Sequence, residues 1–206
     1  MNATQRREKH REELRRAILD AARDLFVREG YESFSMRKLA ERIDYSPASI
    51  YKHFESKDQI FQCLVQESFA ALVELQARSN ANLEQVPISA LKRGLRTYVD
   101  FGLQNPNHYR FAFLMQPTVP APYMRNEAFE SLHRKVAQCI QGKLFRTKDV
   151  DTAAQSLWAA VHGVTSLLIV KPQFPWVNHE TLIGQVIDSA VEGLLKKPGS
   201  AAQRRS

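Results

Sequence analysis

The sequence has only two cysteines, Cys63 and Cys139, and they lack the spacing of metal ligands. We therefore expect no metal site, and we predict two buried, reduced thiols in a cytoplasmic protein. The N-terminus contains no apolar stretch of the kind found in secretory signals. Nor does the chain contain a continuous apolar run of about 18 residues, so no membrane span is expected.

The motifs of common catalytic sites are also missing. The sequence has no Gly-rich phosphate loop, no metal-ligand pair on a helix and no Gly-x-Ser-x-Gly elbow. Its carboxylates are scattered over the polar faces of helices and suggest no catalytic pair. We therefore expect neither an enzyme nor a cofactor.

Positive charge is present but not concentrated. The net charge of +7 permits an anionic partner. Residues 1–60, however, carry 13 Lys and Arg against 11 Asp and Glu, whereas residues 61–206 carry 16 against 11. Any case for nucleic-acid binding must therefore rest on where individual charges lie.

Apolar residues recur at helical spacing through almost the whole chain, which predicts an all-α fold of about nine helices and no strand. A composition break at residues 79–87 divides the chain, and residues 1–9 and 198–206 look like frayed polar tails. The predicted units are a helix-turn-helix domain at 11–71 and a larger helical domain at 80–197. The expected helices are 11–29, 35–43, 46–53, 57–79, 88–104, 107–115, 123–144, 150–170 and 180–196.

Two short helices at residues 35–57 meet at a tight turn, and each begins with a serine that can cap it, Ser35 and Ser46. Helices this short need flanking helices to be stable. The expected core residues are Leu39, Ala40, Ile43, Ile50 and Phe54. Two helices joined in this way form a helix-turn-helix, whose second helix can enter the major groove of DNA.

The segment SMRKLAERIDYSPASIYKHFESK resembles the DNA-binding signature of the TetR family of transcriptional regulators. The matching positions are Leu39-Ala40, Ser46, Ile50-Tyr51, His53-Phe54 and Lys57. The resemblance covers about residues 11–70 and implies a dimer that binds a double-stranded DNA operator. Asp44 replaces the family's usual turn glycine, but Asp tolerates left-handed backbone better than most residues.

Small side chains on the second helix would let it approach base edges, where Ser49 or Lys52 could bind a base or a phosphate. The resemblance implies phosphate contacts from Tyr51 and His53. Cations and free amides at the starts of helices suit phosphates as well. The predicted DNA-binding residues are Ser35, Arg37, Lys38, Tyr45, Ser46, Pro47, Ala48, Ser49, Tyr51, Lys52, His53 and Lys57.

The helices at about 150–170 and 180–196 are too apolar for a monomer's surface. Pairing them with their copies in a four-helix bundle would bury them, so we expect a homodimer through these helices. An intramolecular core that hides them is the alternative.

Trp158 and His162 are one helical turn apart and, with Gly163, resemble a Trp-x-x-x-His-Gly (WHG) motif of one TetR subgroup. They could line a cavity for a small hydrophobic effector, or they could simply pack in the core. The predicted effector-binding residues are Phe101, Tyr109, Phe113, Phe129, Trp158 and His162, with Phe111 and Met115 as further candidates.

The function expected from these features is ligand-responsive repression: a dimer binds a palindromic operator and is released by a small apolar molecule. The helix at 57–79 would transmit the signal, because it alone continuously links the two predicted domains. The alternatives are a TetR-like activator and a carrier of small hydrophobic molecules that does not bind DNA.

Overall fold

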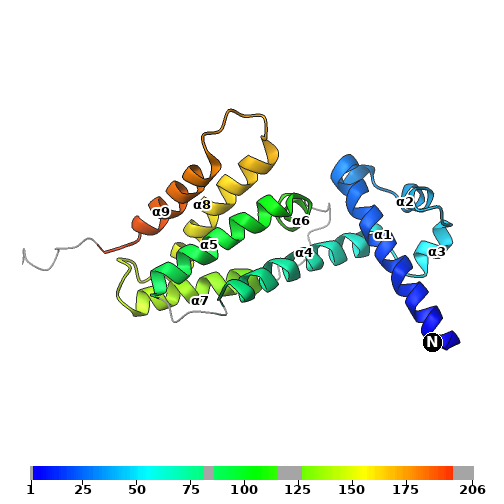
Figure 1. The fold of residues 1–206 in the computed structure, drawn as a ribbon, viewed down its shortest axis with the longest axis horizontal. Helices are drawn as coiled ribbons and strands as arrows, with labels where there is room; N and C mark the ends of the chain where they lie inside the picture. The colour runs from blue at the N-terminus through cyan, green and yellow to red at the C-terminus, as the bar shows by residue number, and fades with distance from the viewer. Residues whose placement is uncertain (1, 81–85, 116–126, 197–206) are drawn as a thin grey trace, which may run out of the picture. The chain divides into compact units, whose positions relative to one another are not determined.

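The computed structural model describes residues 2–80, 86–115 and 127–196, and these ranges are almost entirely helical (Figure 1). They contain nine α-helices and one short π-helix, which confirms the predicted all-α fold. Within the described ranges no strand occurs; a single antiparallel bridge joins Phe145 and Leu195.

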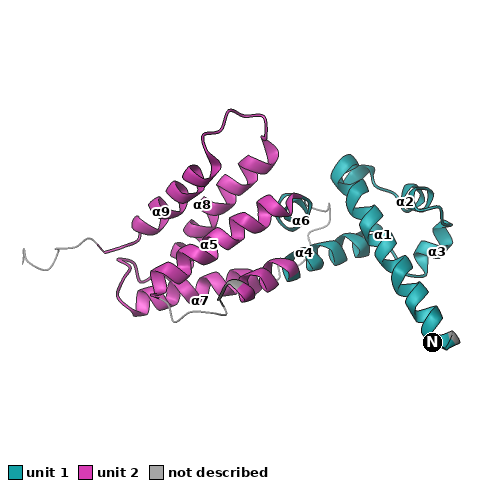
Figure 2. Cartoon of the chain, viewed as in Figure 1, with its two compact units in different colours: residues 1–70, 107–123 teal, residues 71–106, 124–206 magenta. Residues whose placement is uncertain are grey.

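The chain divides into two compact units (Figure 2). Unit 1 comprises Met1–Ala70 and Asn107–Tyr123, and unit 2 comprises Ala71–Pro106 and Met124–Ser206. The helix α4 (Lys57–Asn80) contributes residues to both. Unit 1 otherwise holds α1 (Ala3–Ser33), α2 (Met36–Arg42), α3 (Pro47–Tyr51), most of α6 (Pro106–Tyr109) and the π-helix η1 (Arg110–Leu114). Unit 2 otherwise holds α5 (Pro87–Gln104), α7 (Glu127–Gln141), α8 (Val150–Val170) and α9 (His179–Glu192).

The helix α1 begins at Ala3, so the expectation of a frayed tail over residues 1–9 is wrong for the described part of that segment. The side chain of Asn2 accepts a hydrogen bond from the Gln5 amide, and the Gln5 side chain accepts one from the Asn2 amide. This reciprocal capping starts α1 at Ala3. The predicted C-terminal tail, 198–206, lies outside the described residues.

The helix-turn-helix forms as the sequence predicts. Ser35 caps α2 by accepting from the Lys38 amide, and Ser46 caps α3 by accepting from the Ser49 amide, each at 3.2 Å. Asp44, in the turn between the two helices, has a φ of +57°. The turn therefore requires the left-handed backbone that Asp was expected to supply.

Aromatic rings form the centre of the unit 1 core. Phe26 of α1 stacks on Phe34 at 4.0 Å and meets Phe61 of α4 edge-on at 5.4 Å. Phe111 of η1 completes this group, 5.8 Å from Phe26 and 5.5 Å from Phe61. The sequence groups Phe111 with the larger domain, whereas in the structure its side chain is buried in the helix-turn-helix unit. The expected core residues Leu39, Ala40, Ile50 and Phe54 are buried as well, while Ile43 is only partly buried.

In unit 2, α8 packs against α5, α7 and α9. Two ion pairs fasten α5 to α9, Lys92 to Asp188 and Arg96 to Glu180, both at 2.7 Å. By length and composition α8 could cross a membrane, although no membrane span was expected from the sequence. Core helices of soluble proteins share these properties, and α8 buries one face among its neighbours.

Replacing Phe111 by Ala should destabilise the protein by about 3–5 kcal/mol, because the cavity would lie among Phe26 and Phe61. Chemical denaturation followed by circular dichroism measures this. Phe174→Ala is the control, since Phe174 is exposed in unit 2. Equal unfolding midpoints for the two variants would contradict the placement of Phe111.

Candidate nucleic-acid interface and effector site

The helix α3 has one buried anchor and an open outer surface. Ile50 is fully buried, whereas Tyr51 is 53% exposed and Ala48 and Lys52 are also exposed. Tyr45, just before the helix, is 40% exposed. Pro47, the first residue of α3, is exposed, and Ser49 is partly exposed.

The hydroxyl groups of Ser46 and Ser49 lie 2.9 Å apart and share a hydrogen bond. Both therefore take part in the cap of α3. Each hydroxyl oxygen keeps further hydrogen-bonding capacity, so the shared bond does not exclude contact with an outside group.

Most of the cationic side chains predicted to contact DNA already interact with other groups of the protein. Arg37 pairs with Glu41 at 3.0 Å, and Lys38 pairs with Glu29 at 2.6 Å. The ammonium group of Lys57 lies 4.3 Å from the centre of the Tyr31 ring, and this cation–π contact orients it. A phosphate at Arg37 or Lys38 would have to share these cations with a carboxylate.

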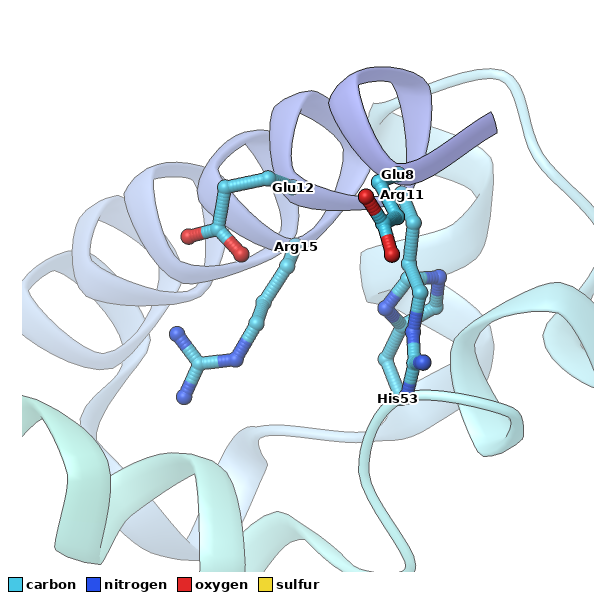
Figure 3. A pocket seen from close by; sticks show the side chains of 5 residues that line it. All are labelled: Glu8, Arg11, Glu12, Arg15 and His53. Carbon is cyan, nitrogen blue, oxygen red and sulfur yellow. The ribbon is translucent and has the colours of Figure 1, made fainter. Parts of the chain in front are cut away.

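A polar pocket beside His53 was not anticipated from the sequence. Figure 3 shows its lining by Glu8, Arg11, Glu12 and Arg15 of α1 together with His53. Burial, and then the charges of Arg11 and Arg15, lower the pKa of His53. The polar residues of α1 mix Arg, Lys and Glu without a regular order, so no sequence pattern indicates which of its side chains meet His53.

A second polar cluster lies in unit 2. The Trp158 indole donates to the Tyr98 hydroxyl oxygen at 3.2 Å, and this oxygen lies 3.1 Å from His162 Nδ1. Phe129 meets the Trp158 ring edge-on at 5.8 Å. Burial lowers the pKa of His162, which favours the neutral imidazole. Trp158 and His162 share a face of α8 as expected; Tyr98, on α5, has no distinguishing local motif and was missed.

The predicted effector-binding residues fall into two groups. Phe101, Phe129, Trp158 and His162 belong to unit 2, with Phe101 buried on α5. Tyr109 and Phe113 belong to unit 1, where Phe113 packs on Phe69 at 5.3 Å and on Tyr109 at 4.9 Å.

Two serine-capped helices across a left-handed turn, the second exposed above a buried anchor, form a helix-turn-helix, the arrangement whose second helix can enter the major groove of DNA. The family model described as bacterial regulatory proteins, tetR family, matches residues 18–64. A second, described as tetracyclin repressor-like, C-terminal domain, matches residues 91–192. The chain belongs to the TetR family of transcriptional regulators, whose members bind DNA and dimerise; they are regulators rather than enzymes.

Solved structures share the fold. A TetR family transcriptional regulator, PfmR, from Thermus thermophilus is 22% identical, with 87% of this chain and 99% of that one covered and a TM-score of 0.69. A TetR family regulator from Marinobacter aquaeolei is 19% identical, with coverages of 94% and 100% and a TM-score of 0.69. A Clostridium perfringens protein, described as a candidate regulator of fatty acid metabolism, is 20% identical, with coverages of 88% and 100% and a TM-score of 0.69.

If a DNA phosphate approaches His53, operator affinity should rise as the pH falls from about 8 to about 5.5. The free protein holds the pKa of His53 low, a phosphate would raise it, and binding would then take up a proton. The gain should level off below the pKa of the free protein. Fluorescence anisotropy with operator DNA at constant ionic strength measures this, with His10→Gln as the control and His53→Gln expected to flatten the dependence. An unchanged pH dependence in His53→Gln would exclude the contact.

Proposed function

We propose that this protein is a ligand-responsive repressor that acts in the cytoplasm, binds a pseudo-palindromic operator as a dimer and is released by a small, largely apolar effector. The observation that carries the proposal is the exposed α3, capped by Ser46 and anchored through buried Ile50 in a TetR-family chain. Such a helix can enter the major groove.

In this proposal Ala48, Ser49 and Lys52 face base edges. The other predicted contacts hold the phosphate backbone and set the register. These are Ser35, Arg37, Lys38, Tyr45, Ser46, Pro47, Tyr51, His53 and Lys57. The pocket at His53 supports adding Arg11 and Arg15 to the phosphate contacts, since both are cations close to that side chain.

Binding-site selection from random DNA with the purified protein should recover one pseudo-palindromic sequence. Lys57→Gln should weaken binding to all sequences alike and lower the salt slope by about one, because one phosphate contact is lost. Lys52→Gln should relax the preference at one position in each half-site. Lys148→Gln, an exposed charge in unit 2, serves as the control. Binding without sequence preference would refute the repressor function.

The outward face of α8 supports a dimer through α8 and α9. Leu167 and Val170 are 49% and 48% exposed, although both are apolar. They continue a partly exposed stripe of small residues at helical spacing: Ser156, Ala159, Ala160, Gly163 and Ser166. On α9, Ile183, Ile187 and Val191 are buried within the protomer, whereas Leu182, Val186 and Ala190 are not fully covered. Pairing with a second copy would cover the remainder.

Leu167→Glu should convert the dimer to a monomer, because a charge would be buried at the interface. Gln138→Glu, which adds the same charge at an exposed position of α7, is the control. Sedimentation velocity measures the mass, and operator affinity should fall by at least about 100-fold when the two half-sites are no longer bound together. A Leu167→Glu variant that remains a dimer would contradict this interface.

The Tyr98–Trp158–His162 cluster and Phe129 support an effector site in unit 2, where aromatic area surrounds a few hydrogen-bonding groups. Membership of the WHG subgroup of the TetR family is proposed from the residues Trp158, His162 and Gly163 alone. The helix α4 would carry the signal, since its residues belong to both units. A reporter gene under the selected operator distinguishes the alternatives: an activator raises expression, and a carrier leaves it unchanged.

A further inference from the structure

Three cations of α5 have contrasting environments. Lys92 pairs with Asp188, and Arg96 pairs with Glu180 and Asp100, so both are neutralised. Arg93 differs: its Nε atom is buried and has no hydrogen-bond partner within the ranges that the structure describes. The helix therefore holds one guanidinium group whose charge no carboxylate of the described residues balances.

Lys135 of α7 lies beside this arginine. Its ammonium group lies against α5 at Gly94. Gly94 has no side chain, and a Cβ atom added there would lie 3.4 Å from Nζ. Nζ donates a hydrogen bond to the neutral hydroxyl of Ser131, at 3.1 Å. Burial lowers the pKa of Lys135, and the charges of Arg134 and Arg93 lower it further.

Half-buried cations that repel one another carry an unfavourable free energy unless an anion is supplied. In unit 2 the neighbouring cations Lys92 and Arg96 receive carboxylates from α9 or their own helix. Arg93 and Lys135 receive none among the described residues, although both remain partly exposed. An outside anion can therefore reach them.

The cationic pair and the aromatic cluster lie along the same two packed helices. On α7, Phe129 precedes Lys135 by about 9 Å of helix, and on α5, Gly94 precedes Tyr98 by about 6 Å. Lys135 contacts α5 at Gly94, while Phe129 contacts Trp158, which in turn bonds to Tyr98. One amphipathic molecule of moderate length could span both.

We propose that Arg93 and Lys135 bind the carboxylate or phosphate group of the effector, whose apolar body lies against Phe129 and Trp158. This inference rests on the proposed function, since it assumes that unit 2 holds the effector. A cationic pair of this kind favours oxyanions over neutral polar groups, because charge-assisted hydrogen bonds are the stronger ones.

Dodecanoate, dodecyl phosphate and dodecanol share one alkyl chain and differ in the head group. Isothermal titration into the full-length protein should show that at least one anion binds about tenfold more tightly than the alcohol. Comparison of the two anions distinguishes a carboxylate site from a phosphate site. Lys135→Met and Arg93→Met should each reduce the preference to about twofold or less while leaving the dodecanol affinity within about threefold. Lys148→Met, which removes an exposed charge from the same unit, should keep the wild-type preference.

Stability in inorganic phosphate gives a readout that does not depend on the alkyl chain. At matched ionic strength, phosphate in place of chloride should raise the unfolding temperature of the wild type but not of Lys135→Met. Equal head-group affinities in the wild type, or an undiminished preference in both variants, would overturn the proposal. If none of the alkyl probes binds, an equal phosphate effect on the wild type and Lys135→Met would also overturn it.

Release of operator DNA is measured separately with the same probes. If an anion binds through Lys135 without releasing DNA, the anion site is supported and its role in induction is refuted. If dodecanol releases DNA as effectively as the anions do, induction by an apolar molecule is supported and the anion site is refuted.

Discussion

The packing of aromatic rings around Phe26 is the constraint on which the DNA-binding surface depends. The helices α2 and α3 have seven and five residues, too few to be stable alone. Their orientation comes from Leu39, Ile50 and Phe54, which are buried in the same core as Phe26. Phe61 and Phe111 close that core from α4 and η1, so residues far from α3 in sequence determine how α3 is presented.

The features that could be predicted from the sequence are those that depend on residues close together in the chain. Serine caps, the left-handed residue Asp44 and the apolar spacing of Leu39 and Ile50 each act within a few residues, so a sequence pattern can register them. The same holds for Trp158 and His162, one turn apart. Contacts between distant segments leave no such pattern. Tyr98 meets α8 across about sixty residues of chain, and Glu8 lines the pocket at His53 from a part of α1 that precedes the predicted helix start at residue 11.

Charge illustrates why totals mislead in this protein. In unit 1, Arg23 and Lys38 pair with Glu67 and Glu29, so many of its cations are balanced by carboxylates. The positive excess lies mostly beyond residue 60, and it includes Arg93 and Lys135, which form no ion pair with the residues that the structure describes. Net charge therefore says little about DNA binding here, whereas the environments of individual side chains support both the proposed DNA contacts and the proposed effector site.

Because of the π-helix η1, the packing of the unit 1 core depends on the number of residues in the segment Arg110–Leu114. The Met115 amide bonds to the Arg110 carbonyl oxygen at 2.8 Å, a turn that encloses one residue more than an α-helical turn. Loss of a single residue from Arg110–Leu114 would allow a regular α-helix to form there. It would also change the angle between the side chains on either side of the deletion, because each α-helical residue turns by about 100° around the helix axis. Phe111 and Phe113 could then no longer both keep their present neighbours, so related chains that retain this core should conserve the number of residues between α6 and Met115 more strictly than their identity.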